Sequence, residues 1–250
     1  MTNAADLTDD ELDRYARHIV LREIGGQGQM KLRAAKVALV GMGGIGAPAA
    51  LYLAAAGVGT LGLIDDDHVS LSNLQRQVLY ATRDAGASKA ESAATHLNDL
   101  NPYCACRIHR LRLDEGNAAE VLGGYDLVID GCDNFPTRLL VNRVCHKLKI
   151  PLISAAIGRF SGQLATFHGS PCYQCLVPEV PPDAETCERV GVVGALAGVM
   201  GTLAALEAVK WITGAGETLK GRLMIFDGLS FDSRIVRLAA DPKCPVCSGH

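Results

Sequence analysis

The stretch KVALVGMGGIGAP, residues 36–48, decides the fold because it joins a hydrophobic strand to a glycine-rich turn and the start of a helix. Its glycines match the pattern G-x-G-x-x-G of dinucleotide-binding loops. Gly41 permits the tight turn, Gly43 lets the backbone approach a phosphate, and Gly46 allows the helix to pack closely on the strand. Free N–H groups at the start of the helix can hold an anion. The stretch therefore predicts a phosphate-binding loop, with a ligand-free glycine turn as the alternative.

The residues around the loop narrow the choice of ligand. Asp65 ends the next predicted strand, about 20 residues further on, where a carboxylate meets a ribose hydroxyl. Ala47 and Pro48 follow Gly46, so the loop lacks the Gly-Lys-Ser or Gly-Lys-Thr end of a Walker A motif. A triphosphate bound to this loop needs its cations from other parts of the chain.

Such cations follow the second strand. Asn73 and Arg76 stand close together in SLSNLQRQ, and Lys89 lies near a predicted helix start in GASKAES. Cationic donors offset the charge on a departing pyrophosphate, whereas a nicotinamide dinucleotide does not need them. Taken singly, Arg76 or Lys89 is better explained as a solvated surface charge. The set as a whole favours ATP that is split.

A second acidic feature follows the hydrophobic segment YDLVID, residues 125–130. Asp133 and Asn134 come directly after it, at the carboxyl end of a strand, where open α/β sheets bind their ligands. A carboxylate facing a phosphate loop suits Mg²⁺, which prefers one or two carboxylates plus phosphate oxygens. Capping of the next helix by Asp133 or Asn134, worth about 1 kcal/mol, is the alternative.

Strands and helices alternate up to residue 158, which predicts a mostly parallel, doubly wound, Rossmann-like α/β sheet. After Arg159 the pattern changes to three segments typical of antiparallel strands, a C-terminal extension of the same sheet. The expected strands are 36–41, 60–65, 106–113, 125–130, 151–157, 162–169, 222–228 and 234–240. The expected helices are 8–21, 26–35, 46–57, 88–101, 135–149 and a long glycine- and alanine-rich helix from residue 190.

Composition and charge exclude several classes of protein. The chain has 250 residues and a net charge of −3, so nothing suggests a nucleic-acid or membrane surface. Its start is polar and acidic, unlike a signal peptide. The uncharged run 190–206 is short for a membrane span and leads into Glu207 and Lys210, which favours a buried helix. We expect a cytoplasmic protein.

Nine cysteines without a secretory signal argue against a disulfide framework. Two C-x-x-C pairs, Cys172 with Cys175 and Cys244 with Cys247, predict a Cys₄ zinc site. A closed site with four sulfur ligands is structural rather than catalytic. Two redox motifs or free thiols are the alternatives.

Cys187 stands apart, just before the predicted long helix, where a helix N-terminus lowers the pKa of a thiol and makes it more nucleophilic. An inert, partly buried residue is the alternative interpretation. The remaining cysteines fall in strand or helix patterns and are expected in the core: Cys104, Cys106, Cys132 and Cys145.

Over nearly the whole chain, these features resemble the MoeB/ThiF group of bacterial adenylyltransferases, relatives of the ubiquitin-activating enzymes. The stretches that carry the resemblance are RYARHI, GMGGIG, LIDDDHVSLSNLQRQ, CDNFPTR, CYQC, TCERVGVVG, GVMGTLAALEAVK and CPVC. The resemblance implies that the C-terminal glycine carboxylate of a small ubiquitin-like sulfur carrier attacks the α-phosphate of ATP. Acyl-adenylate and pyrophosphate are the products.

The resemblance also assigns roles to individual residues. Asp65 would hold the ribose, Asp133 would bind Mg²⁺, and Cys187 would form an acyl-disulfide link in the thiamine branch of the group. Arg17 matches an arginine that reaches the active site of the other subunit, which implies a homodimer. The implied contacts to the nucleotide are Gly41, Gly43, Gly44, Gly46, Asp65, Ser72, Asn73, Arg76, Lys89, Asp133 and Asn134.

We expect one adenylyltransferase domain, residues 1–250, with N-terminal helices (1–35), a nucleotide-binding half (36–158) and a carrier-binding, zinc-bearing half (159–250). The sequence that begins with the helix after the glycine loop, from residue 46, is more similar to the thiamine branch, whose carrier is ThiS-like and ends in Gly-Gly. A MoaD-like carrier of molybdopterin synthesis is the alternative. Since no rhodanese-like domain follows, the sulfur donor is expected to be a separate cysteine desulfurase or rhodanese-like protein.

The resemblance has one departure, and three other functions stay open. Arg159 and Phe160 interrupt a segment that usually has small residues, so the fit of the carrier tail is not specified. A nicotinamide oxidoreductase would explain the glycine loop and Asp65 only. A related dehydratase acting on a tRNA base would need a basic surface that the composition does not provide. A nucleotide-binding scaffold without turnover is the third alternative.

Overall fold

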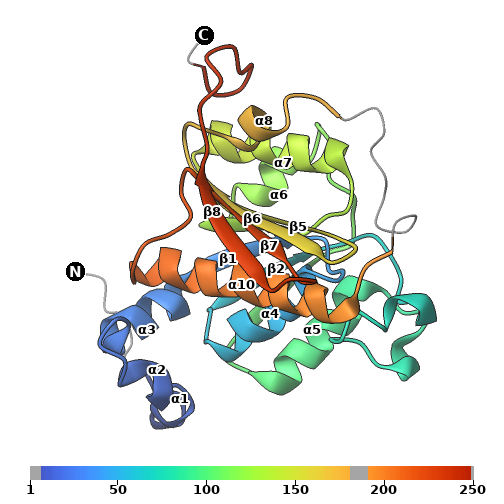
Figure 1. The fold of residues 1–250 in the computed structure, drawn as a ribbon. Helices are drawn as coiled ribbons and strands as arrows, with labels where there is room; N and C mark the ends of the chain where they lie inside the picture. Colours follow the sequence, from blue (N-terminus) through green and yellow to red (C-terminus); the bar gives the residue numbers. More distant parts are fainter. Residues whose placement is uncertain (1–6, 181–190, 249–250) are drawn as a thin grey trace.

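The computed structural model describes residues 7–180 and 191–248, which form one mixed sheet of eight strands (Figure 1). The strand order is β3-β2-β1-β4-β5-β6-β7-β8. Strands β1 to β5 are parallel, and β6 to β8 continue the sheet antiparallel, which confirms the predicted architecture. The strands are β1 (Lys36–Val40), β2 (Thr60–Ile64), β3 (Ala105–His109), β4 (Leu127–Asp130), β5 (Leu152–Gly158), β6 (Ser161–Phe167), β7 (Arg222–Asp227) and β8 (Asp232–Arg237).

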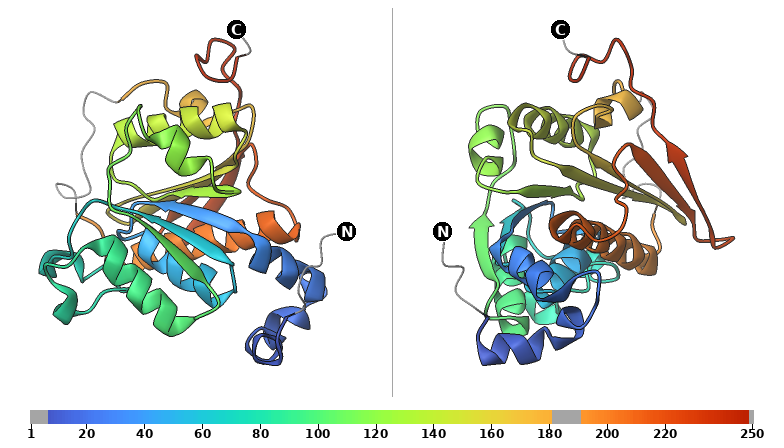
Figure 2. Two further views of the ribbon diagram at one scale, coloured as in Figure 1. Left: turned by 180° about the vertical axis from the view of Figure 1, so that it is seen from behind. Right: turned by 90° about the vertical axis from the view of Figure 1, so that its left-hand side faces the viewer.

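Helices cover both faces of the parallel part of the sheet (Figures 1 and 2). One layer holds α3 (Gly25–Ala34), α4 (Gly46–Ala55), α5 (Lys89–Leu100) and α10 (Gly194–Thr213), and the other holds α6 (Ala118–Leu122), α7 (Phe135–Leu148) and α8 (Tyr173–Leu176). In β1, Val37 and Leu39 face the first layer while Ala38 and Val40 face the second, because successive strand residues point to opposite faces. The central strand is therefore apolar throughout, as a strand covered on both faces must be.

The chain moves outward from β1 to β2 and β3, then crosses back so that β4 pairs with the other side of β1. This reversal between β1 and β4 is the topological switch point of the sheet. Loops leaving the carboxyl ends of the two strands diverge there and open a crevice, which is where such sheets bind ligands.

Tertiary packing moved several of the predicted helix boundaries. The expected helix 8–21 is two helices, α1 (Asp9–Arg14) and α2 (Ala16–Ile19), with Tyr15 between them at φ −100° and ψ 11°. Tyr15 is buried, and its hydroxyl accepts a hydrogen bond of 2.8 Å from Asn101 Nδ2. The helix is therefore interrupted at the residue whose ring is held in the core. Helix α6 was not predicted, because a helix this short has no detectable periodicity.

The long helix α10 continues beyond the uncharged run that suggested it. Glu207 is buried, but its carboxylate accepts a hydrogen bond of 2.7 Å from Thr166 Oγ1 and pairs with Lys210 Nζ at 3.0 Å. By length and composition α10 also meets the criteria for a membrane span, as the core helix of a folded protein can. Its packing against α4, α3, β5 and β6 agrees with the predicted buried helix.

We predict that Gly201→Ala in α10 lowers the free energy of unfolding by about 1–3 kcal/mol, the usual effect of overpacking. A Cβ at this position would lie 2.4 Å from the Ile45 carbonyl oxygen and 2.5 Å from Pro48 Cγ, so α10 and α4 must move apart. Urea denaturation monitored by circular dichroism measures the change.

Gly198→Ala in the same helix is the matched control, because a Cβ there meets nothing within 4 Å. Alanine favours a helix over glycine by up to about 1 kcal/mol, so this variant should be at least as stable as the parent. Equal destabilisation by both variants would contradict the packing argument.

Candidate active site

A cavity of about 400 Å³ opens at the carboxyl ends of β1, β2, β4 and β5. Gly41, Gly43 and Gly44 line it, and Gly41 has φ +88°, a conformation that favours glycine. Gly46 lies below the surface: a Cβ there would be 1.9 Å from the Gly41 carbonyl oxygen. The missing side chain of Gly46 thus lets the two ends of the loop come into contact. The sequence had suggested only that it lets the helix approach the strand.

Asp65 connects the glycine loop to the end of β2. Its carboxylate accepts hydrogen bonds from the backbone N–H of Met42 at 2.7 Å and of Asp67 at 2.8 Å. Burial raises the pKa of Asp65 above its ordinary value, and the positive charge of Lys89 partly opposes this rise. The carboxylate therefore lies at the cavity wall in a fixed orientation.

Lys89 is the first residue of α5, and its side chain is only 7% exposed. Its Nζ donates to Asp67 Oδ2 at 2.9 Å. A buried cation needs such a partner. Lys89 is thus not the solvated surface charge that was the alternative interpretation.

Arg76 also lines the cavity, and its hydrogen-bond partners among the described residues are neutral. Its guanidinium donates to Asn73 Oδ1 at 3.1 Å and to the Ser72 carbonyl at 3.2 Å. Asn73 lines the cavity as well, while the exposed Ser72 is not among the residues that line it. Within the described residues, Arg76 therefore keeps an uncompensated positive charge beside the phosphate loop.

The sequence left helix capping and magnesium binding open for Asp133 and Asn134, and the structure gives the two residues different surroundings. Asn134 is the N-cap of α7, and its Oδ1 accepts the Thr137 N–H at 3.0 Å. Asp133 is exposed at the cavity wall. In the described ranges the carboxylates that cluster are Asp65, Asp66 and Asp67, so magnesium binding by Asp133 stays a prediction.

Two further expected residues lie elsewhere. Arg17 is exposed on α2 and does not line the cavity of its own chain. Cys187 lies outside the described residues, as does Val190, where the long helix was predicted to begin. Residues 191–193 are described and are not helical, so the predicted start was too early and α10 begins at Gly194.

Sequence reasoning missed a buried ionic cluster at the wall of the cavity, which Cys132 and Arg138 line. Asp130, which ends β4, is fully buried and pairs with Arg138 of α7 at 3.3 Å. Ser154 Oγ and Cys132 Sγ donate to the same carboxylate at 3.2 and 2.7 Å. Burial and the negative charge of Asp130 raise the pKa of Cys132 well above its ordinary value, so this thiol is not a nucleophile. The only sequence signal for Arg138 was the motif CDNFPTR.

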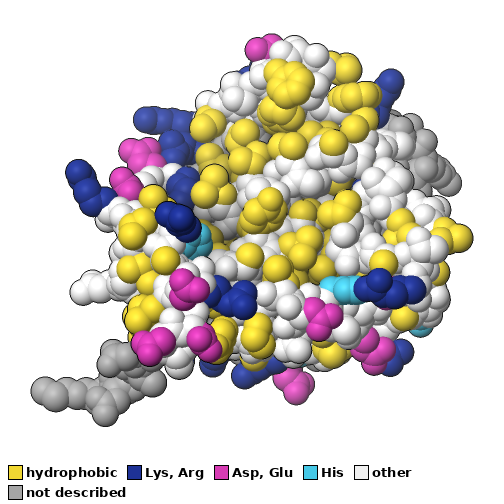
Figure 3. Space-filling model, turned by 90° about the horizontal axis from the view of Figure 1, so that it is seen from below, with side chains coloured by type: hydrophobic (Ala, Val, Ile, Leu, Met, Phe, Trp, Pro, Cys, Tyr) yellow, Lys and Arg dark blue, Asp and Glu magenta, His cyan; other side chains and the backbone are white. Residues whose placement is uncertain are grey.

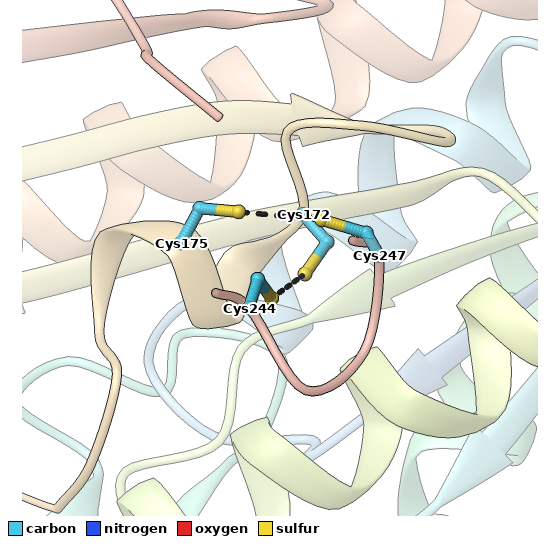
Figure 4. Close-up of side chains that lie close together, drawn as sticks. All are labelled: Cys172, Cys175, Cys244 and Cys247. Carbon is cyan, nitrogen blue, oxygen red and sulfur yellow. Dashed lines mark hydrogen bonds between the residues drawn. The ribbon is translucent and has the colours of Figure 1, made fainter. Parts of the chain in front are cut away.

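Four cysteine side chains lie close together where the C-terminal segment packs beside α8 (Figure 4). The Sγ atoms of the two C-x-x-C pairs all lie within 4.8 Å of one another, with Cys172 to Cys244 at 3.6 Å and Cys175 to Cys247 at 3.3 Å. A tetrahedral zinc with sulfur ligands at 2.3 Å requires sulfur atoms about 3.8 Å apart. The cluster therefore has the composition and size of a four-sulfur metal site. It joins the C-terminal segment to α8.

A model of the ThiF family matches residues 15–246 of the chain. The chain belongs to the ThiF family. The SAMP-activating enzyme E1 of Haloferax volcanii is 46% identical over 250 residues, covering 99% of this chain and 92% of that protein. The sulfur carrier protein adenylyltransferase of Thermus thermophilus is 45% identical over 249 residues, covering 96% of this chain and 92% of that protein.

A longer relative is the adenylyltransferase and sulfurtransferase MOCS3 of Drosophila sechellia, which is 47% identical over 249 residues. The match covers 98% of this chain but 55% of that protein, so this ThiF-family chain spans about half its length. The crystal structure of Escherichia coli MccB with MccA-N7isoASN has a TM-score of 0.83 at 22% identity, covering 98% of this chain and 77% of that chain. This likeness confirms the fold.

We predict that Arg138→Met lowers the free energy of unfolding by about 3–5 kcal/mol, because it leaves the Asp130 carboxylate buried without its charge partner. Arg143→Met, in the same helix, removes an exposed pair with Glu115 and should cost less than about 1 kcal/mol. Urea denaturation of both variants measures the difference. Equal losses of free energy of unfolding would show that the buried pair with Asp130 stabilises the fold no more than the exposed pair does.

Proposed function

We propose that this ThiF-family chain uses ATP to adenylylate the C-terminal glycine carboxylate of a small ubiquitin-like sulfur carrier. The observation that carries the proposal is the single cavity lined by the glycine loop, Asp65, Arg76, Lys89 and Asp133. Relatives named sulfur carrier protein adenylyltransferase and SAMP-activating enzyme support the same reaction.

The carrier supplies the nucleophile. A terminal carboxylate is ionised at neutral pH, so the chain needs no general base. A carboxylate oxygen forms a bond to the α-phosphorus of ATP, while the bond from that phosphorus to the pyrophosphate oxygen breaks. The products are acyl-AMP and pyrophosphate.

The chain positions the nucleotide and offsets its charge. The glycine loop and the start of α4 hold the phosphates, and the Asp65 carboxylate accepts from the ribose hydroxyls. Arg76 and Lys89 stabilise the negative charge that develops on the departing pyrophosphate. Asp133 would hold Mg²⁺, which neutralises the phosphate oxygens when bound.

The carrier docks, in this proposal, on an apolar turn beside the cavity. The pairing of β5 with β6, β6 with β7 and β7 with β8 places the turn 228–231 at the carboxyl end of β5, where the cavity lies. Phe160, Leu229 and Phe231 are 41%, 74% and 84% exposed at this end. Strand β8 is also the outer strand of the sheet (Figure 1), so its free backbone groups can pair with an incoming strand.

The proposal includes a homodimer. Arg17 lies outside the cavity of its own chain, which is consistent with the role that the resemblance implies, a contact with the active site of a second copy. Apolar side chains gather on the face seen in Figure 3, and Val20 of the α2 C-cap, Tyr52 of α4 and Leu206 of α10 are 76%, 58% and 54% exposed. Light scattering at micromolar concentration tests this, and a monomer would contradict it.

We propose the thiamine branch, with a ThiS-like carrier, and keep a MoaD-like carrier as the alternative. The names of the relatives do not choose between them. In the thiamine branch Cys187 forms a covalent link with the carrier. Unchanged adenylylation and sulfur delivery by Cys187→Ala would exclude that role. The separate sulfur donor and the cytoplasmic location stay predictions.

We predict ATP–pyrophosphate exchange in the presence of a carrier ending in Gly-Gly. Arg76→Ala should lower the exchange rate by roughly 10²- to 10³-fold, the usual effect of losing one donor to a developing charge. Arg110→Ala is the matched control, because Arg110 pairs with Glu91 at an exposed site outside the cavity. Absence of exchange with every carrier, or tight NADH binding without ATP binding, would contradict the proposal.

We predict that Phe231→Ser raises the KM for the carrier by roughly tenfold, which corresponds to about 1.4 kcal/mol of lost contact. The KM for ATP should not change. Tyr103→Ser is the control, because Tyr103 is 38% exposed before the amino end of β3, at the opposite end of the sheet. A larger effect on ATP than on the carrier would place the docking surface elsewhere.

We propose that the four-cysteine cluster binds zinc as a structural ion, and predict about one zinc per chain by mass spectrometry of the purified protein. Cys172→Ser should lose the metal and lower the thermal midpoint, since metal binding contributes folding energy. Cys106→Ser, outside the cluster, should retain it. Full zinc content in Cys172→Ser would contradict the site.

A further inference from the structure

Gln77 is a residue of the cavity that none of the roles above uses. It is 4% exposed, lines the cavity, and follows directly after Arg76. Its Nε2 lies 3.6 Å from the position of a Cβ on Gly43, so it is next to the phosphate loop. Among the described residues, its Oε1 is a buried acceptor without a hydrogen-bond partner.

The neighbouring side chains determine which way the Gln77 amide points. Asn73 Nδ2 donates to Ser70 Oγ, so Asn73 Oδ1 faces the other way. That oxygen accepts from Arg76 Nη2 and from Gln77 Nε2, each at 3.1 Å. Rotating the Gln77 amide would bring two oxygens together, so Oε1 is the atom left for another donor.

The chemistry of the proposed substrates restricts that donor. Ionised phosphate oxygens accept hydrogen bonds and cannot donate. In the proposed mode of binding the ribose hydroxyls donate to Asp65, at the end of β2, and the base is attached to that ribose rather than to the phosphates held by the glycine loop. The carrier tail has backbone N–H groups close to the reacting carboxylate.

The position of Gln77 agrees with this restriction. The segment that carries it contacts both the glycine loop and the first turn of α10: a Cβ on Gly44 would lie 3.6 Å from Arg76 Cγ, and Gly194 packs against Gln75. Val192, just before α10, and Ile157, near the end of β5, line the same cavity. This is the side that faces the proposed carrier surface.

We propose that Gln77 Oε1 accepts the N–H of the terminal glycine of the carrier and so orients its carboxylate towards the α-phosphate. The inference rests on the proposed adenylylation. An oriented carboxylate reacts faster because its alignment precedes the chemical step. Removing either partner should therefore lower the rate of adenylylation more than the affinity for ATP.

The experiment is a double-mutant cycle between protein and carrier. The carrier is made by semisynthesis with its terminal glycine replaced by glycolate, which exchanges the amide N–H for an ester oxygen. The enzyme variant is Gln77→Met, which keeps the length of the side chain but not its acceptor. ATP–pyrophosphate exchange gives kcat/KM for the carrier in all four combinations.

Each single change should lower kcat/KM by roughly tenfold, the loss expected for one hydrogen bond at a reacting group. The double change should lose no more than either alone, and the KM for ATP should stay within about twofold because the nucleotide contacts are intact. Gln75→Met, at an exposed position outside the cavity, serves as the matched control.

Three outcomes would overturn the inference. Additive losses would show that Gln77 and the tail N–H do not interact. A raised KM for ATP alone would show that Gln77 acts only by holding Asn73 and Arg76. Equal rates with the native and ester carriers in the unmodified enzyme would exclude the bond even if Gln77→Met failed to fold. No exchange with any native carrier would instead overturn the proposed function itself.

Discussion

The close contact inside the glycine loop is the constraint on which the site depends. Residue 46 can carry no side chain, since a Cβ would lie 1.9 Å from the Gly41 carbonyl oxygen. This contact turns the chain sharply from β1 into α4. The Gly41 N–H then bonds to the Ile64 carbonyl at 2.9 Å, and the Met42 N–H bonds to Asp65 at 2.7 Å. The glycine loop and the Asp65 carboxylate are therefore one rigid unit.

Ion pairs fix the positions of two other charged side chains that line the cavity. Lys89 and Arg138 are both buried, and each has a carboxylate partner, Asp67 and Asp130. Such pairs keep buried cations charged and oriented before a substrate arrives. Within residues 7–180 and 191–248, the guanidinium of Arg76 donates to neutral oxygens, so its charge remains available to an anion. The cavity thus combines two ion pairs, which orient Lys89 and Arg138, with Arg76, whose guanidinium meets only neutral oxygens among the described residues.

Local sequence patterns could predict the loop, Asp65 and the alternating strands because each depends on short-range geometry or periodicity. The two C-x-x-C pairs were equally clear, because metal ligands have a characteristic spacing. Arg138 and Gln77 end two of the stretches that carry the resemblance, CDNFPTR and LIDDDHVSLSNLQRQ, but no local pattern indicates that either side chain is buried at the cavity. The break at Tyr15 was also invisible, because its anchor, Asn101, is distant in the chain.

The sequence by itself therefore determined the class of sheet, the phosphate loop and the residue types that a nucleotide and a four-sulfur site require. These follow from backbone conformation and ligand spacing, which act over a few residues. Only the tertiary structure decided that Lys89 is buried against Asp67 and that Asn134 caps a helix while Asp133 faces the cavity. It also decided that Gln77 lines the cavity with an oxygen that has no hydrogen-bond partner in the part of the chain that the structure describes. Burial and hydrogen-bond partners depend on segments brought together by folding, and the local sequence does not specify them.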